Sequence, residues 1–219
     1  MNPIQKTFRS CVGAAALAAL CVPALLPAAP ARAAASAADA AQLDQAVAAL
    51  RAISTMKADF VQTDRNGQVL RGTLTLKRPG RIRFQYEKSA RMLIVGDGKA
   101  LTLIDYAVNQ VQRWPISNSP LGALLDPRRD VARYGKAMPT GNPNVISVEV
   151  RDTAHPEYGV ITLIFTRKAS APGGLELSYW VALDSQNQRT TIALSNQRYG
   201  APVSDNDFRW NDPRPRTHR

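Results

Sequence analysis

Hydrophobic and polar side chains alternate along residues 70–106, which indicates β-strands. In Arg81–Tyr86, for example, Ile82, Phe84 and Tyr86 alternate with charged or amide side chains. Successive side chains of a strand point to opposite faces, so each strand has an apolar and a polar face. The stretch therefore predicts an antiparallel sheet with one apolar face and one solvated face.

Short turns divide the chain into hairpins. Asn66-Gly67 and Asp97-Gly98 are typical of tight β-turns, and Pro79-Gly80 turns the chain between them. The pattern predicts strands over residues 56–62, 70–76, 82–86, 92–95, 101–106, 145–151, 159–166, 175–183 and 190–197, and a short last strand at Phe208 and Trp210. A single sheet of this size has to curl.

Two segments have helical rather than alternating patterns. Leu43, Val47 and Leu50 lie on one face of residues 40–53, which predicts an amphipathic helix after a disordered lead over residues 34–38.

Residues 109–144 show no strand pattern. There, Leu121–Leu125 predicts a short apolar helix, and Asp126 is expected to cap a second helix at Pro127. The fold class that follows is mainly β (α+β). We expect an incomplete antiparallel β-barrel of about ten or eleven strands, covered by a lid of short α-helices.

The first 33 residues have the features of a secretory signal peptide. Basic residues precede an apolar run over residues 11–26, and Ala31-Arg32-Ala33 supplies a small-x-small cleavage site. Residues 34–219 then form a single exported domain. Both cysteines, Cys11 and Cys21, leave with the signal peptide, so no disulfide or thiol chemistry is expected in the mature chain.

The charge of the chain is strongly basic. Cleavage removes three of the 28 basic residues and none of the 17 acidic ones, so the net charge falls from +11 to +8. For an exported protein this favours anionic membrane surfaces or acidic proteins as partners, and not nucleic acid. A surface that is merely soluble explains the charge equally well.

The parts of a catalytic or metal site are missing from the sequence pattern. The two histidines, His155 and His218, fall in a turn and in the tail, and no zinc-protease, nucleophile-elbow or phosphate-loop motif occurs. Asp205-Asn206-Asp207 fits a capped turn better than a calcium loop. We therefore expect no enzyme activity and no cofactor, and we expect the apolar face itself to bind a lipid or acyl chain.

Arg78 stands at a strand end among apolar neighbours, just before Pro79. Its guanidinium can donate five hydrogen bonds, and carbonyl groups of the lid are suitable acceptors. Spacing alone leaves the alternative of an exposed hairpin arginine open.

Four motifs in order resemble the LolA family, the periplasmic carriers of outer-membrane lipoproteins. They are Phe60-Val61-Gln62, the run 76–84 around Lys77-Arg78-Pro79-Gly80, the run 94–99 with Asp97-Gly98-Lys99, and Ser119-Pro120-Leu121. The resemblance implies a half-barrel with a helical lid, and an apolar cavity that receives the acyl chains of lipoproteins.

The resemblance also implies partners and a role for Arg78. An inner-membrane ABC transporter would load the carrier, and an outer-membrane receptor or the outer membrane itself would unload it; we expect a monomer. Arg78 matches the family's latch arginine. Ile82 and the pair Thr102-Leu103 stand where aromatic residues are common in the family, and the tail 211–219 does not match the longer extension of some members.

The predicted ligand-binding residues fall into a cavity lining, a lid and a latch. The lining comprises Phe60, Leu74, Leu76, Ile82, Phe84, Tyr86, Met92, Ile94, Leu101 and Leu103, the lid comprises Leu121, Leu124 and Leu125, and the latch is Arg78. Alternative functions are a carrier of another lipid or glycolipid, a lipid-sensing regulator domain, and a hydrolase with a dispersed site.

Overall fold

The computed structural model describes residues 29–116, 119–126 and 131–215. Its strands are β1 (Thr55–Thr63), β2 (Val69–Lys77), β3 (Arg81–Tyr86), β4 (Met92–Asp97), β5 (Ala100–Asp105), β6 (Gln110–Pro115), β7 (Gly135–Met138), β8 (Val145–Arg151), β9 (Val160–Arg167), β10 (Leu175–Leu183) and β11 (Arg189–Tyr199). The helices are α1 (Ala29–Ala52) and α2 (Pro120–Leu125), and the 3-10 turns are η1 (Lys88–Ala90), η2 (Pro156–Tyr158), η3 (Pro172–Gly174) and η4 (Asp205–Phe208).

All eleven strands belong to one antiparallel sheet, in the order β6-β5-β4-β3-β2-β1-β11-β10-β9-β8-β7. Strands β1–β6 and β7–β11 each form a meander, and the pairing of β1 with β11 joins the two. The edges, β6 and β7, are not paired to each other, so the sheet is open. The predicted fold class, a mainly β half-barrel, is confirmed.

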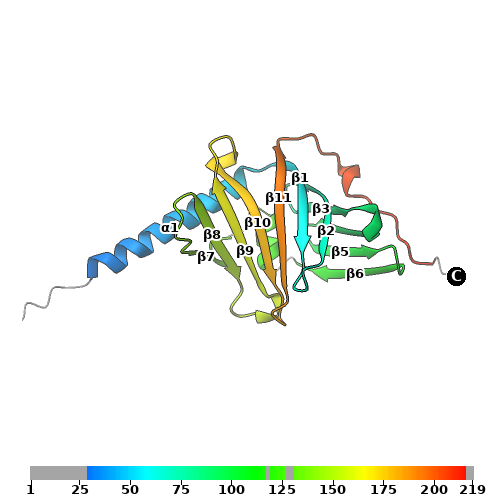
Figure 1. Ribbon diagram of the computed structural model, residues 1–219, viewed down its shortest axis with the longest axis horizontal. Coiled ribbons are helices and arrows are strands. Elements are labelled where there is room, and N and C mark those ends of the chain that lie inside the picture. The colour runs from blue at the N-terminus through cyan, green and yellow to red at the C-terminus, as the bar shows by residue number, and fades with distance from the viewer. Residues whose placement is uncertain (1–28, 117–118, 127–130, 216–219) are drawn as a thin grey trace, which may run out of the picture.

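The sheet curls strongly, as the twist of adjacent strands requires in a sheet of this width. In Figure 1, β8 to β11 and β1 run steeply down the view, whereas β5 and β6 run nearly across it. We call the face that carries α1 and α2 the inner face. Side chains of both helices join those of the sheet there in one hydrophobic core.

Helix α1 begins at Ala29, well before the predicted start near residue 40, and residues 34–38 are helical rather than disordered. Alanine has the highest helix propensity, so the alanine-rich lead extends the helix without needing an apolar stripe. Most of the predicted signal peptide, residues 1–33, lies outside the described residues. None of the described helices is long and apolar enough to cross a membrane.

Three other element predictions are wrong or fall outside the described residues. Strands β6 and β7 lie within residues 109–144, where no strand was predicted. The sequence pattern did not reveal them, because β6 has no buried face and β7 has only four residues. Phe208 and Trp210 do not form a strand: Ser204 and Asp207 cap each other's backbone, which starts η4 instead. The helix expected at Pro127 lies in residues 127–130, outside the described part.

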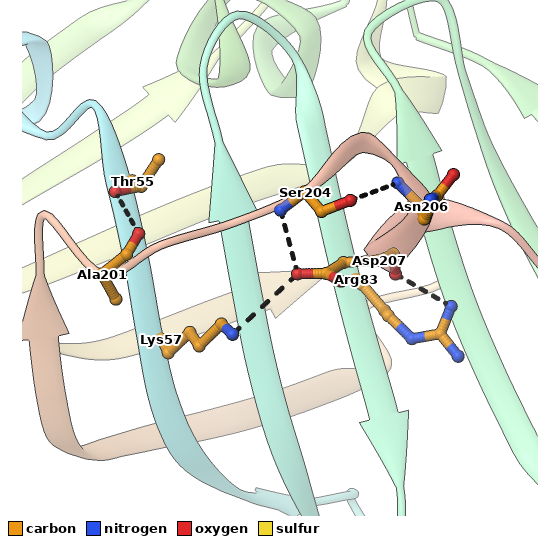
Figure 2. Close-up of polar contacts among 7 residues, drawn as sticks. All are labelled: Thr55, Lys57, Arg83, Ala201, Ser204, Asn206 and Asp207. Carbon is orange, nitrogen blue, oxygen red and sulfur yellow. Dashed lines mark hydrogen bonds and ion pairs between the residues drawn. The ribbon is translucent and has the colours of Figure 1, made fainter.

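The chain after β11 crosses the outer face of the sheet, as Figure 2 shows. We call residues 200–210 the C-terminal strap. Thr55 Oγ1 donates to the Ala201 carbonyl (2.8 Å), and Arg83 Nη1 donates to the carbonyls of Asp207 (3.2 Å) and Arg209 (2.9 Å). The Nζ of Lys57 lies 3.9 Å from the Asp207 carboxylate. A polar groove of about 350 Å³ remains between the strap and the sheet.

The strap also gives the outer face a small core of its own. Phe208 is buried, with 8% of its surface exposed, against Leu93, Val95 and Ile104. These three side chains point away from the inner face, so β4 and β5 are apolar on both sides. Part of the outer face is therefore buried, whereas the alternation alone predicted that this face is solvated throughout.

Two hairpin turns touch at their tips. Gly80 and Gly98 both have positive φ, 76° and 86°, and a Cβ atom on Gly80 would lie 2.5 Å from the Cα of Gly98. Only glycine at position 80 permits this approach. The contact fixes the β2–β3 turn, which carries Arg78, against the β4–β5 turn.

Replacing Phe208 by alanine should lower the free energy of unfolding by about 3–5 kcal/mol, since it removes a buried aromatic ring and leaves a cavity. Urea denaturation measures the loss. Val108→Ala, at a side chain that is 58% exposed, is the control and should change stability by less than about 0.5 kcal/mol. Equal effects of the two variants would mean that the strap does not contribute a core.

Gly80→Ala should destabilise the protein by clearly more than Gly67→Ala. Both glycines have nearly the same φ, 76° and 78°, so the left-handed backbone penalty of roughly 1–2 kcal/mol applies to both. Gly67 has no atom within 4 Å of an added Cβ, so the difference between the variants isolates the contact with Gly98. Thermal or urea unfolding of both variants measures it, and equal losses would contradict the tight contact.

Candidate functional site

Aromatic rings form the floor of the inner face. Phe60 on β1 packs edge to face against Phe84 (ring centroids 5.3 Å apart) and against Tyr86 (5.1 Å), both on β3. Gly72 on β2, between these strands, makes room for the Phe60 ring, because a Cβ there would lie 2.8 Å from it. Edge-to-face pairs of this kind add to the energy of apolar burial.

The inner face is deeply buried at its centre and less covered toward β6. Across the strands, Phe84 is 6% exposed, its neighbours Ile94 and Leu103 are half-buried, and Trp114 on β6 is 46% exposed. Trp114 pairs with Leu101, so it stands on the same face at the sheet's edge. The apolar surface therefore opens toward β6.

The structure brings the predicted site residues together on the inner face and on α2. Buried among them are Phe60, Leu74, Leu76, Ile82, Phe84, Tyr86, Leu124 and Leu125, and half-buried are Arg78, Met92, Ile94, Leu101, Leu103 and Leu121. Their role as ligand contacts remains a prediction. Sequence reasoning missed Trp114, because β6 has no alternation of buried and exposed side chains that would have marked it as a strand.

The lid over this face is α2, a helix of six residues. Ser119 caps it: its hydroxyl accepts from the Gly122 amide (3.2 Å) and donates to the Ile116 carbonyl (2.8 Å). Leu124 and Leu125 are buried in the main core. Such a short helix is not stable alone, so its packing on the inner face holds it in place.

Arg78 joins the lid to the sheet. Its Nη1 donates to the Leu124 carbonyl at 2.7 Å, and the Gly80 amide donates to the Leu125 carbonyl at 2.9 Å. The last carbonyls of a helix lack partners within the helix and attract positive charge, so a guanidinium suits this end of α2. The expected hydrogen bond between Arg78 and a lid carbonyl is present, and Arg78 is not an exposed hairpin arginine.

Burial makes this contact costly as well as specific. It lowers the pKa of Arg78 to about 10, against the opposing effect of the Asp126 carboxylate, so the guanidinium stays charged at neutral pH. Its Nε is buried with no hydrogen-bond partner. An unmade bond on a buried donor offsets part of the gain from the bond to Leu124.

A second polar contact lies at the other end of the aromatic floor. The Tyr86 hydroxyl donates to Gln62 Oε1 at 2.6 Å, and burial raises the pKa of Tyr86 to about 12. The hydroxyl therefore remains a neutral donor. Among the described residues no group of three or more His, Cys, Asp or Glu side chains could hold a metal ion.

Comparison with known proteins places the chain. Residues 51–211 match the family model described as outer membrane lipoprotein carrier protein LolA. An outer-membrane lipoprotein carrier protein of Chromobacterium violaceum is 29% identical over 180 residues, covering 77% of this chain and 84% of the relative.

A protein of the same name from Xanthomonas campestris pv. campestris (strain B100) is 28% identical over 179 residues, covering 73% of this chain and 79% of the relative. The crystal structure of a LolA superfamily protein from Nitrosomonas europaea aligns with a TM-score of 0.47 at 10% identity, covering 78% of this chain and 97% of that one. On the family match, which spans most of its length, the chain belongs to the LolA family.

Proposed function

We propose that this protein binds the acyl chains of lipoproteins on its inner face, beneath α2, and carries them through the periplasm from the inner to the outer membrane. The observation that carries the proposal is the hydrogen bond from Arg78 to the Leu124 carbonyl, which fastens a short helix over an apolar sheet face. Relatives with this family's name support the choice of cargo.

The inner face suits a ligand that is held and then released. Its centre is filled by its own side chains and by Leu124 and Leu125 of the lid. An acyl chain gains about 25 cal/mol per Å² of buried apolar surface, but it has to replace the lid contacts that are already there. The free energy of binding is therefore the difference between two similar energies, the one gained by burying the acyl chain and the one lost with the lid contacts. Cargo can pass to an acceptor without making or breaking covalent bonds.

The cycle needs a donor and an acceptor with graded affinity for the same chains. We assign these roles to an inner-membrane lipoprotein-releasing ABC transporter and to an outer-membrane receptor or the outer membrane itself. The mature carrier comprises residues 34–219, acts as a monomer and is not an enzyme.

Arg78→Leu should bind a fluorescent acyl probe about tenfold more tightly than the wild type and release it more slowly to acceptor vesicles. The variant loses the charged hydrogen bond that favours the closed lid, a contribution of about 1.5–3 kcal/mol before the cost of burial is subtracted. A larger open population raises apparent affinity. Fluorescence titration and stopped-flow transfer measure the two quantities.

Arg65→Leu is the matched control, because Arg65 lies exposed in the β1–β2 turn, away from the lid. It should behave as the wild type. If Arg78→Leu and the control showed the same affinity and release rate, Arg78 would not be a latch.

Phe84→Glu should abolish the release of lipoproteins from spheroplasts, because an acyl chain bound on the inner face would bury the carboxylate without a compensating partner. Gln85→Glu introduces the same charge one residue later on the outer face and should support normal release. Leu103→Glu tests the inner face at a half-buried position where folding tolerates a charge better. Circular dichroism establishes folding, and normal release by folded Phe84→Glu and Leu103→Glu would rule out this binding face.

A further inference from the structure

The free edge of the sheet lies beside the open part of the inner face. Exposure of the apolar side chains rises from Phe84 through Leu103 to Trp114 on β6, where the sheet ends. An acyl chain that enters the inner face at this side passes β6. Whatever is covalently attached to the acyl chain then begins next to β6.

Strand β6 has the properties of an unfilled pairing edge. No strand of the described residues pairs with β6 along the edge that faces away from β5, and five of its six residues are exposed. An edge strand presents a row of unpaired N–H and C=O groups that another extended chain can meet. Of the devices that block such edges, β6 has Pro115 at its end and Arg113, whose Nη2 is bonded to Asp97 at 2.9 Å.

The other edge is different. Strand β7 has four residues, and α1 packs against it so closely that a Cβ on Gly135 would lie 2.7 Å from Leu43. The inner face at that end is filled by the helix. Of the two edges, only β6 combines an open backbone with a nearby apolar opening.

On the proposed function, the occupant of this edge follows from the chemistry of the cargo. The acyl chains of a bacterial lipoprotein are attached to its amino-terminal cysteine, so its polypeptide starts within a few bonds of them. We propose that the extended residues after the acylated cysteine pair with β6 as an additional strand. This inference rests on the proposed acyl site.

Backbone pairing suits a carrier with many different cargo proteins. Main-chain hydrogen bonds are independent of side-chain identity. Strand β6 carries no acidic residue, and its one basic side chain, Arg113, is already engaged by Asp97. The edge therefore selects an extended backbone rather than a particular sequence, and Trp114 covers the junction between peptide and acyl chains.

Three short-chain ligands test the pairing with the full-length mature protein. The first is S-(dioctanoylglyceryl)cysteine amide, the second extends it by six alternating serine and alanine residues, and the third is the second with its peptide nitrogens methylated. The second should bind about tenfold more tightly than the first and the third, as two or three net backbone hydrogen bonds predict. Isothermal titration calorimetry measures the three affinities.

Hydrogen exchange locates the contact. The second ligand should slow exchange in residues 110–115 of β6, and the first should not; β7, over residues 135–138, serves as the internal control. Equal affinity of all three ligands, or slowing at β7 instead of β6, overturns the pairing but leaves the acyl site standing. Failure of all three to bind overturns the proposed function itself, and the pairing with it.

Discussion

The pairing of β1 with β11 holds the molecule together. Each meander could form from local hairpins, but only this pairing makes one sheet of them, with Phe60 opposite Leu194. Opposite Lys57–Asp59 of β1, strand β11 carries one extra residue between Ser195 and Arg198, and this bulge bends β11 at the seam. The pairing of β1 with β11 also directs the two ends of the described chain to opposite faces of the sheet. The Gly200 amide bonds to the Thr55 carbonyl, so the strap leaves β11 onto the outer face while α1 approaches β1 on the inner one.

The lid links the two edges that this arrangement leaves open. The chain leaves β6, passes through α2 and enters β7. The lid is thus connected to both edge strands of the sheet and is hydrogen-bonded to the β2–β3 turn, residues 78–80. This turn is itself held by the contact with Gly98 and by the Ser54 carbonyl, which accepts from the Arg78 amide at 2.8 Å. On the outer face, Asp205 of the strap bonds to Lys77 and Arg81 on either side of the turn.

Sequence reasoning succeeded where one face of an element is buried and the other is wet. The alternation in Arg81–Tyr86 identified both the strand and its inward side chains, and the isolated apolar run at residues 121–125 identified the lid. It failed where burial has no period. Strand β6 is exposed on nearly every residue, and α1 is extended by alanine alone. The strap was missed because its partners lie more than a hundred residues away in the sequence.

The pairing of β1 with β11 also determines when, during folding, the apolar inner face becomes protected from aggregation. Residues that pair across it, such as Met56 and Tyr199, lie far apart in the sequence, and contacts of this range form late and slowly. During synthesis the amino-terminal meander emerges first, with the β11 side of β1 unpaired and the apolar inner face uncovered there. Until the last strand arrives, the half-barrel is itself a chain with exposed apolar surface, and its vulnerability to aggregation is set by the time between the delivery of β1 and of β11.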